Sequence, residues 1–515
     1  MCLSATFLHR LLSRSLVSNI KKSVIANYLG SGWSFAIYIA LIPVYISYLG
    51  VESFGVIGFI TMLQMWLFIL DLGITATVSR EAARFMAGVH STQSFRDLVR
   101  SLELVFIGIA LCIIGLTYFS SELLTEYWLR IDSLQKSTVE DVLSLSGILF
   151  AIKWITGFYR GALVGMQQQI WINCYGAVFS TVRGLGVVGI LAWIAPTLYA
   201  FITFQIFITV VECIFFIAKT YSFLSQRSMR SRFRFSSLRG VCKFSAGMSF
   251  NMLLALLVSQ SDKIILSKLL SLTEFGYYTL ASTVAAGLYV LTGSVTNVAY
   301  PKFVYLISKN DHDSLIRIYH TFSQLVSVII IPPSLLLAVY SERIMYLWLG
   351  DSITASTVAP ILSILIIGTM INCLMQVPYY LQTAYGWTGL NIAVNLICLL
   401  IVVPAIYLSV PAYGTIAPPI IWLLINICIF IITIPIMHSK LIPSEMRSWY
   451  VDDTLVPTFF VLLIICFTYF YIYTFVADEP FSGLLTVFFG GTIGLLGGIF
   501  AAPLVRNRLI DLVKR

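Results

Sequence analysis

The residues of this sequence that are best able to do chemistry are ionisable side chains embedded in long apolar stretches. Placing a charge at the centre of a lipid bilayer costs roughly 2.5–3.5 kcal/mol, so such residues are functional candidates by default. The candidate cations are Lys153, Arg160, Arg183 and Lys263, and the candidate acids are Asp71, Glu212 and Asp262. Cations at this depth would bind an anionic ligand, whereas acids would bind a coupling ion or pair with the cations.

Arg183 is the strongest candidate for an anion-binding residue. Gln169, Asn173, Gly176, Ser180 and Arg183 follow one another at steps of 4, 3, 4 and 3 residues, which places them on one face of a helix. A guanidinium presents five donors in a planar fork that matches a phosphate group. We therefore expect Arg183 to lie near the middle of the membrane, on a continuous polar face.

Lys153 belongs to a second, narrower polar stripe. Ser146, Gly157 and Arg160 lie seven residues before it, four after it and seven after it, on the same helical face. Lys153 is too deep in its apolar stretch for its side chain to reach the interface easily. Arg160 also has a simpler interpretation, because a base at the cytoplasmic end of a helix serves membrane orientation.

Asp71 and Glu212 each have two interpretations. Asp71 shares a helical face with Gln64, and it is either a functional acid or a hydrogen-bonded structural residue. Glu212 lies in the inner half of the sixth apolar stretch. It would either take part in ion coupling or pair with Lys153 or Arg183.

Asp262 and Lys263 are adjacent in the sequence, yet a helix would separate them. Neighbouring residues on a helix point about 100° apart, so the two charges cannot easily neutralise each other. Lys263 shares its face with serines that include Ser259 and Ser267, whereas Asp262 shares a different face with Asn251. Either face could line a cavity. Lys263 lies close to the outer end of its stretch, so extension to the outer interface is an alternative.

The apolar stretches after residue 276 carry neutral polar side chains instead of comparable buried charges. These are Gln324, Asn372, Gln376, Asn391 and Asn395, together with tyrosines and threonines of segment 277–297. Amides and hydroxyls suit the hydroxyl groups of a sugar. We therefore expect a cavity that is cationic on its N-terminal side and rich in amides and hydroxyls on its C-terminal side.

The elements that must position these residues are transmembrane helices. The 515 residues are 59% hydrophobic and 11% charged, with a mean hydropathy of +0.92, which leaves too little polar surface for a soluble protein. A spanning helix needs about 20 apolar residues. The segments that qualify are 24–48, 56–78, 101–119, 142–162, 171–194, 198–219, 244–267, 277–300, 319–340, 356–379, 388–409, 413–437, 455–476 and 482–504. They are apolar all round, which favours an all-α polytopic membrane protein with about fourteen helices over a β-barrel.

The distribution of lysine and arginine predicts the orientation of these helices. With a cytoplasmic N-terminus, 25 of the 32 basic residues fall on the cytoplasmic side and four, Arg130, Lys136, Lys268 and Arg343, fall outside. Both termini are therefore expected in the cytoplasm, and the number of helices is expected to be even. The net charge of +9 is mostly this orientation signal, so it does not imply nucleic acid. The basic loop 219–243 is expected to lie against anionic lipid headgroups.

An internal repeat organises the chain into two lobes. At an offset of 221 residues, Leu49 matches Leu270 and Phe54-Gly55 matches Phe275-Gly276, and at an offset of 220 Trp128-Leu129 matches Trp348-Leu349. Six helices per copy give a parallel repeat, and two such bundles suggest a transporter with a central cavity. The predicted parts are a basic arm (1–23), an N-terminal six-helix lobe (24–219), a basic linker (220–243), a C-terminal six-helix lobe (244–438), two accessory helices (455–505) and a cytoplasmic tail (506–515).

Several segments match sequence motifs of other chemistry, but their context in the chain does not support that chemistry. "GLGVVG" at 184–189 fits a dinucleotide-binding fingerprint but lies inside an apolar stretch, where helix packing explains it. "NDHD" at 310–313 is better explained as a loop and helix cap than as a metal site. The nine cysteines and five histidines are scattered, so we expect no metal and no cofactor. No predicted outer loop exceeds about twenty-five residues, which argues against an enzyme with a catalytic outer domain.

The segments "YLGVESFGVIGF", "LDLGITATVSREAAR", "FYRGALVGMQQ", "SDKIILSKLLSLTEFGYYTLA", "VAYPKF", "YLWLGD" and "LQTAYGWTGLNIAVN" resemble the Wzx-type O-antigen flippases. These form part of the multidrug/oligosaccharidyl-lipid/polysaccharide (MOP) exporter superfamily, and the resemblance runs from about residue 24 to 400. It implies a two-lobed helical bundle in the bacterial inner membrane. It also implies transfer of an undecaprenyl-pyrophosphate-linked oligosaccharide by alternating access, with cationic residues lining the lumen.

The resemblance gives the candidate residues specific roles. Arg183, Lys153 and Lys263 would contact the pyrophosphate or anionic sugars, and Asp71 belongs to the "DLG" motif. A polysaccharide polymerase and a chain-length regulator would be the protein partners. Two alternatives are a drug–cation antiporter of the same superfamily, which should present acids and aromatics to its substrate, and a membrane polysaccharide polymerase or ligase, which would need a catalytic outer loop. The resemblance implies no particular sugar.

Overall fold

The computed structural model of the 515-residue chain describes residues 3–67, 74–89, 91–224, 254, 256–475 and 480–507. The elements in these ranges are helices of the α, 3-10 and π types. Ten of the described helices are long and apolar enough to cross a membrane. The predicted all-α class is confirmed, while the count of fourteen spans remains a prediction. The chain divides into two compact units, unit 1 (Met1–Leu256) and unit 2 (Leu257–Arg515), and each is considered by itself.

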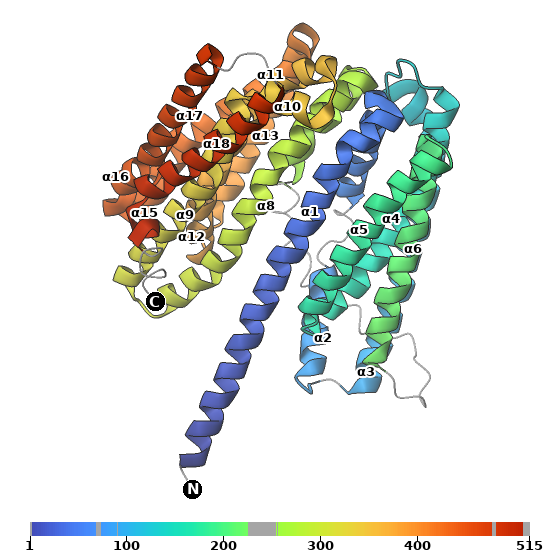
Figure 1. Ribbon diagram of the computed structural model, residues 1–515. Helices are drawn as coiled ribbons and strands as arrows, with labels where there is room; N and C mark the ends of the chain where they lie inside the picture. The colour runs from blue at the N-terminus through green and yellow to red at the C-terminus, as the bar shows by residue number, and fades with distance from the viewer. Residues whose placement is uncertain are drawn as a thin grey trace. The chain divides into compact units, whose positions relative to one another are not determined.

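Unit 1 is a bundle of helices, coloured blue to green in Figure 1. Its helices are α1 (Leu3–Leu67), α2 (Ile74–Met86), α3 (Thr92–Leu123), the π-helical turn η2 (Leu124–Trp128), α4 (Lys136–Gly165), α5 (Gln169–Trp193) and α6 (Leu198–Ser222). Inside α1, Gly50 has φ 79° and ψ 166°, a conformation that is essentially restricted to glycine. This break lies between the first two predicted segments, 24–48 and 56–78.

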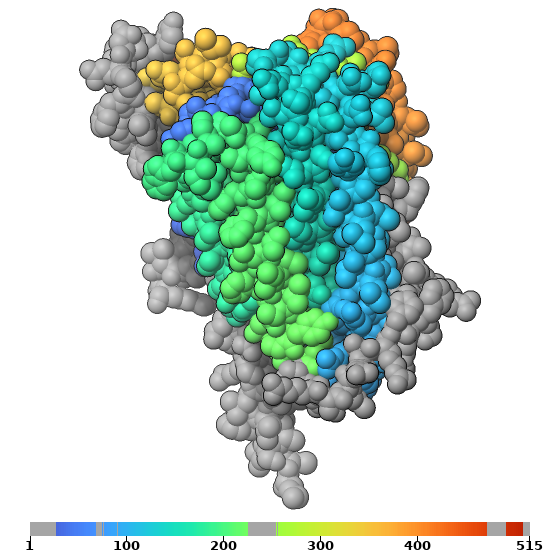
Figure 2. All heavy atoms as spheres, turned by 90° about the vertical axis from the view of Figure 1, so that its right-hand side faces the viewer, coloured from blue at the N-terminus to red at the C-terminus, as the bar shows by residue number. Residues whose placement is uncertain are grey.

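Helix α4 is central to the packing of unit 1. It contacts both α3 and α6, and α5 packs along α1. Figure 2 shows the face on which α3, α4 and α6 run beside one another. The "GLGVVG" glycines lie in α5, and a Cβ on Gly184 would come within 2.5 Å of Leu41 Cδ1 in α1. The motif therefore allows close helix packing, as the sequence analysis proposed.

Unit 2 contains more and shorter elements. They are α8 (Leu272–Ser308), α9 (His312–Val339), α10 (Ser341–Leu349), α11 (Ser352–Leu374), α12 (Gln376–Ala384), α13 (Gly389–Tyr413), η3 (Gly414–Ile416), α14 (Ala417–Cys428), η4 (Ile429–Thr433), α15 (Ile434–Leu441), η5 (Pro443–Glu445), α16 (Met446–Ser448), η6 (Trp449–Leu455), α17 (Val456–Phe475) and α18 (Pro480–Ala501). Asp311 of the "NDHD" stretch caps α9 by accepting the Ser314 backbone N–H at 3.2 Å. Helices α17 and α18 contact each other and α9.

The loops that the internal repeat pairs are built differently in the two units. In unit 1, α3 continues directly into η2, and the loop that follows is held by the carboxylate of Glu52. This buried carboxylate accepts the backbone N–H groups of Asp132 at 2.7 Å and Leu134 at 3.2 Å. In unit 2, α9 stops at Val339 and the separate helix α10 follows. The sequence analysis predicted only a loop between residues 340 and 356, because a nine-residue helix is too short to register as a spanning segment.

Candidate functional site

Arg183 forms an ion pair with Glu212 inside unit 1. The guanidinium Nη2 on α5 lies 2.5 Å from Glu212 Oε2 on α6, and it also lies 3.5 Å from Thr209 Oγ1. The two side chains are about one-quarter and one-sixth exposed, at 24% and 17%. Arg183 Nε is buried and has no hydrogen-bond partner among the described residues. The pairing interpretation of Glu212 therefore describes this structure, and the guanidinium keeps unused donor capacity.

The rest of the polar face of α5 is used partly for packing. Asn173 Nδ2 donates to Asn27 of α1, and Ser180 Oγ lies 3.1 Å from Ser34 Oγ of the same helix. The predicted stripe is thus real as a helical face, but its N-terminal half is covered by α1 in unit 1. Its end at Arg183 turns instead toward α6, because the ion pair with Glu212 holds the guanidinium there.

Lys153 is held by a neutral side chain. Its Nζ donates to Gln64 Oε1 at 2.8 Å, and both groups are half-buried. Because an amide does not cancel the ammonium charge, the cation stays available to an anion. Arg160, two turns further along α4, is exposed at the helix surface, which agrees with its simpler role in orientation. Asp71, which was expected on the Gln64 face, lies outside the described residues.

The carboxylate of Asp262 is hydrogen-bonded to a side chain of α8. The buried Tyr278 Oη donates to Asp262 Oδ2, and Asp262 Oδ1 is buried without a partner among the described residues. Asn251, which the sequence analysis placed on the Asp262 face, lies outside the described residues. Lys263 is half-buried in the helical run 256–269. The expectation that helical geometry separates this acid from this base is therefore consistent with the Tyr278 contact.

Neutral amides form a connected network in unit 2 that extends from the buried Asn426 to the exposed Tyr289. Asn372 Nδ2 donates to Asn426 Oδ1 at 2.7 Å, and Gln376 Nε2 donates to Asn372 Oδ1 at 3.3 Å. Tyr289 Oη donates to the same Asn372 oxygen at 3.2 Å. Asn426 is fully buried and also donates to the Trp422 carbonyl at 2.7 Å. The predicted amides at 372 and 376 thus act together, and they join α8, α11, α12 and α14.

Sequence analysis missed a buried carboxylate at Glu103 on α3. Glu103 is 4% exposed and accepts hydrogen bonds from Tyr159 Oη at 2.8 Å and Tyr221 Oη at 2.6 Å. Arg100 Nη1 lies 3.0 Å from its other oxygen. The signal was available, since Glu103 falls within the predicted segment 101–119. Its position near the segment end made it resemble an ordinary interfacial acid.

A second missed cluster connects histidines that look dispersed in the sequence. His320 Nδ1 lies 2.6 Å from Asp453 Oδ2, and His320 Nε2 lies 3.0 Å from Glu445 Oε2. Gln324 Nε2 donates to Asp453 Oδ1 at 3.0 Å, and its Oε1 accepts the Leu504 N–H at 2.9 Å. These contacts tie α9 to the segment before α17 and to the end of α18. No local sequence signal links residues that lie 125 or more positions apart.

Two chemical classes of site are thus present. In unit 1, half-buried charges such as Arg183 and Lys153 can exchange one partner for another. In unit 2, the network around Asn372 consists of amides and a hydroxyl, which only donate and accept hydrogen bonds, while the charged groups at His320 and Asp262 lie outside that network. Among the described residues, no group of three or more His, Cys, Asp or Glu side chains could hold a metal ion.

Comparison with solved structures defines the class of protein. The chain is similar to the lipid II flippase MurJ in an inward closed conformation, with a TM-score of 0.72, 15% identity, and 95% of this chain and 99% of that chain covered. It is also similar to a mutant of the MATE transporter VcmN of Vibrio cholerae, with a TM-score of 0.58, 14% identity, and coverage of 84% and 98%. At these identities the likeness shows the fold, which is that of the MOP-superfamily transporters.

The family follows from the sequence. Residues 48–358, more than half of the chain, match the model of a family described as polysaccharide biosynthesis proteins, and the chain belongs to that family. A predicted O-antigen transporter of Shigella flexneri is 21% identical over 376 residues, which cover 73% of this chain and 87% of that protein. The chain is therefore a member of a polysaccharide biosynthesis family with the fold of the MOP-superfamily transporters, as its resemblance to the flippases predicted.

Proposed function

We propose that this protein is a flippase that moves an undecaprenyl-pyrophosphate-linked oligosaccharide, an O-antigen or a related repeat unit, across the bacterial inner membrane by alternating access. The observation that carries the proposal is that a member of a polysaccharide biosynthesis family has the fold of a lipid flippase over 95% of its length. The substrate is moved without covalent change, so no residue is assigned a catalytic role.

The charged groups of unit 1 support a pyrophosphate ligand. Arg183 is paired with Glu212 through one nitrogen, and an arriving phosphate would compete for the donors of the fork. Lys153, which is held by the neutral Gln64, adds a second cation that needs no carboxylate to leave. Lys263 of unit 2 is proposed as a further contact and Arg160 as a cytoplasmic contact. The acids Asp71, Glu212 and Asp262 are proposed as ion-coupling or pairing residues.

The decisive experiment is deletion of the gene in the source cell. Undecaprenyl-linked repeat units should accumulate on the cytoplasmic face, and surface polysaccharide should disappear until the gene is supplied again. Lipid extracts separated by mass and a polysaccharide gel measure the two effects. Normal surface polysaccharide in the deletion strain would reject the proposal.

A drug–cation antiporter is the second candidate, because multidrug MATE transporters share the fold at TM-scores such as 0.58 and 0.59. Such a protein should offer acids to a cationic drug. Here Glu212 is engaged by Arg183, and Asp262 accepts a tyrosine hydroxyl. Overexpression should therefore leave drug susceptibility unchanged, whereas broad resistance would favour the antiporter.

We further propose that both termini lie in the cytoplasm and that a polysaccharide polymerase and a chain-length regulator act on the product. The proposed orientation places 25 basic residues inside and four outside. A green fluorescent protein fused to the C-terminus should fluoresce, and alkaline phosphatase fused there should be inactive. Active phosphatase at the C-terminus would reverse the orientation.

A further inference from the structure

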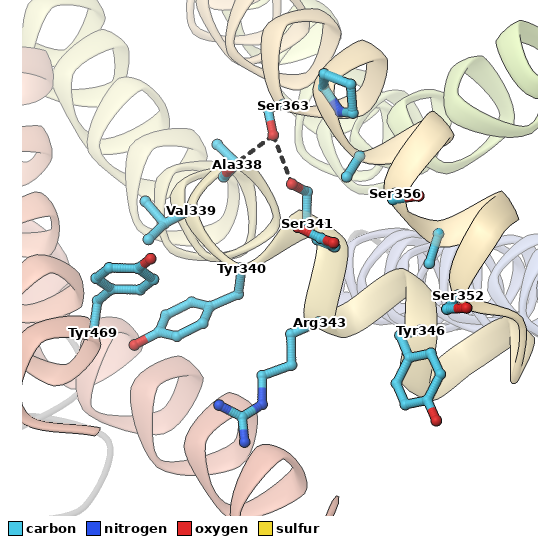
Figure 3. A pocket seen from close by; sticks show the side chains of 14 residues that line it. Ala338, Val339, Tyr340, Ser341, Arg343, Tyr346, Ser352, Ser356, Ser363 and Tyr469 are labelled. Carbon is cyan, nitrogen blue, oxygen red and sulfur yellow. Dashed lines mark hydrogen bonds between the residues drawn. The ribbon is translucent and has the colours of Figure 1, made fainter. Parts of the chain in front are cut away.

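Unit 2 contains a pocket that the function proposed above does not use. It has a volume of about 680 Å³, and Figure 3 shows the side chains that line it. The lining comes from the end of α9, from α10, from the first half of α11 and from Tyr469 of α17. Small-molecule sites typically measure about 300–1,000 Å³, so the pocket has the size of a ligand site.

The corner between α9 and α11 keeps this pocket open. Helix α10 begins directly after Tyr340 and ends at Leu349, and the next residue, Gly350, has a φ of 73° that turns the chain into α11. Ser363 Oγ of α11 donates to the Ala338 carbonyl at 2.9 Å and lies 2.7 Å from Ser341 Oγ. These bonds fix α11 to the corner from both sides. The pocket wall is therefore a built feature and does not depend on loop conformation.

One side of the pocket is an aromatic wall. The rings of Tyr340 and Tyr469 meet edge to face, with centroids 5.4 Å apart and planes at 61°. Tyr340 is buried and its Oη donates to Thr468 Oγ1 at 3.4 Å, whereas Tyr469 is 45% exposed. Figure 3 shows these two rings together on one side, with Arg343 extending below Tyr340. A fixed, half-exposed ring with a hydroxyl at its edge packs against the apolar face of a sugar ring.

The rest of the lining is suited to hydroxyl groups. Ser352 and Ser356 lie on the other side of the view in Figure 3, and both belong to the exposed first turns of α11. Arg343 supplies guanidinium donors, and its neighbour Glu342 supplies carboxylate acceptors. Together they give the donors and acceptors that a polyhydroxylated ligand requires.

The charge balance favours a sugar over a phosphate headgroup. Glu342 and Arg343 are the acidic and basic residues among the fourteen described lining residues, so their formal charges cancel. Glu342 also stands in the first turn of α10, where a carboxylate occupies the positive end of the helix dipole. An anionic headgroup would meet this carboxylate, whereas a neutral sugar would use it as an acceptor.

We propose that this pocket is a carbohydrate-binding site that takes one or two sugar units of the transported glycan on the exit side of the protein. The proposal rests on the flippase function above. It also rests on the predicted orientation, which places the connection between the ninth and tenth predicted helices outside. Arg343 is one of only four basic residues on that side. A base that opposes the orientation trend has a reason to be there if it binds substrate.

Binding of free sugar to the purified, full-length protein tests the site directly. The protein is reconstituted in nanodiscs of phosphatidylcholine, and saturation-transfer difference NMR is recorded with neutral hexoses, N-acetylhexosamines and oligosaccharide released from the source cell's surface polysaccharide. We expect saturable binding that Tyr469→Ala weakens roughly tenfold and Arg343→Ala weakens at least about fivefold. Tyr469→Phe, which keeps the ring, should bind nearly as the wild type does.

Tyr413→Ala is the matched control. Tyr413 ends α13 in the same unit, is 71% exposed and does not line the pocket. Its replacement should leave sugar binding unchanged. Equal binding by wild type, Tyr469→Ala and Tyr469→Phe would overturn the proposal. Loss of the sugar signal on addition of phosphatidylglycerol, together with lipid binding that depends on Arg343, would assign the pocket to an anionic headgroup instead.

The experiments can reject the carbohydrate site and the flippase function independently of each other. Tyr469-dependent sugar binding in a protein whose deletion leaves surface polysaccharide normal would keep the carbohydrate site and reject the flippase. Loss of surface polysaccharide on deletion, with no sugar binding in nanodiscs, would keep the flippase and reject the site. In cells, Tyr469→Ala should slow export while Tyr413→Ala should not.

Discussion

Two polar clusters, one in unit 1 and one in unit 2, are held together by different chemistry. The cluster in unit 1 contains formal charges. They are the Arg183–Glu212 ion pair and Lys153, which donates a hydrogen bond to the neutral amide of Gln64. The middle of unit 2 uses neutral partners, centred on the bond between Asn372 and Asn426. Both solutions satisfy hydrogen bonds, yet they differ greatly in what happens when one partner is removed.

The two clusters differ in how much stability is lost when one partner is removed. Removing one partner of a buried ion pair typically costs about 3–5 kcal/mol, because a charge is left behind. A neutral hydrogen bond contributes only about 0.5–1.5 kcal/mol net. The neutral network is therefore the cheaper way to hold helices together. Charges retained where neutral partners would serve point to a ligand, and the following variants test that contrast.

Replacing Arg183 should have the largest effect. Arg183→Ala leaves Glu212 uncompensated between α5 and α6, so we expect a loss of about 3–5 kcal/mol in stability and no polysaccharide export. The double variant Arg183→Ala/Glu212→Ala removes both charges and should recover most of the stability but none of the export. Thermal unfolding in detergent and a polysaccharide gel measure the two quantities. Export by the double variant would show that the cation serves folding only.

Replacing Lys153 should abolish export at a smaller cost in stability. Lys153→Ala removes one charged hydrogen bond, to Gln64, which is worth about 1.5–3 kcal/mol. Membrane insertion should remain normal, as measured by the amount of protein in the membrane fraction. Lys136→Ala is the matched control on the same helix, because Lys136 is exposed and has no proposed contact with the substrate. Wild-type export by Lys153→Ala would contradict a cationic binding site.

Replacing Glu103 tests whether every buried charge of unit 1 serves the ligand. Glu103→Gln weakens the bonds from Tyr159, Tyr221 and Arg100, so we expect a loss of roughly 1–3 kcal/mol in stability. Glu122→Gln, at an exposed position of the same helix, should change little. Thermal unfolding measures both. If Glu103→Gln keeps full stability but loses export, Glu103 has a role in transport and not in stability.

Replacing Tyr289 should have the smallest effect and sharpens the contrast from the other side. Tyr289→Phe removes one neutral bond to Asn372, worth about 0.5–1.5 kcal/mol, and leaves the link between Asn372 and Asn426 in place. Export should stay within a factor of two of the wild type. A loss of export as complete as that expected for Arg183→Ala would show that unit 2 contacts the substrate through this network.

Hydropathy predicted the all-α membrane fold, because long apolar runs leave few other structures possible. It also placed the break between the first two segments, where Gly50 interrupts α1. Helix α10 was missed because a nine-residue helix carries too few apolar residues to be recognised. The pocket beside it could not be predicted, since it depends on Tyr469, more than one hundred residues further along the chain.

The pairing of charged residues could be predicted only where the two residues lie close together in the sequence. Glu212 lies 29 residues after Arg183, on the next helix, and the pair was one of two interpretations offered. Asp453 lies 133 residues after His320, so periodicity carries no information about their contact. The sequence also predicted which residues share a helical face, but it could not predict which neighbouring helix packs against that face. The face that bears Asn173 and Ser180 proved to be partly buried against α1.

The amide of Gln324 has a mechanical consequence. Its nitrogen holds Asp453, just before α17, and its oxygen holds the backbone of Leu504, just after α18. One side chain of α9 therefore binds the start of α17 and the end of α18, so any movement of α9 should carry this pair of helices with it. Cys466 lies exposed on α17. A spin label attached to this thiol, with the other exposed cysteines replaced, would report the movement of α9 without any alteration of α9 itself.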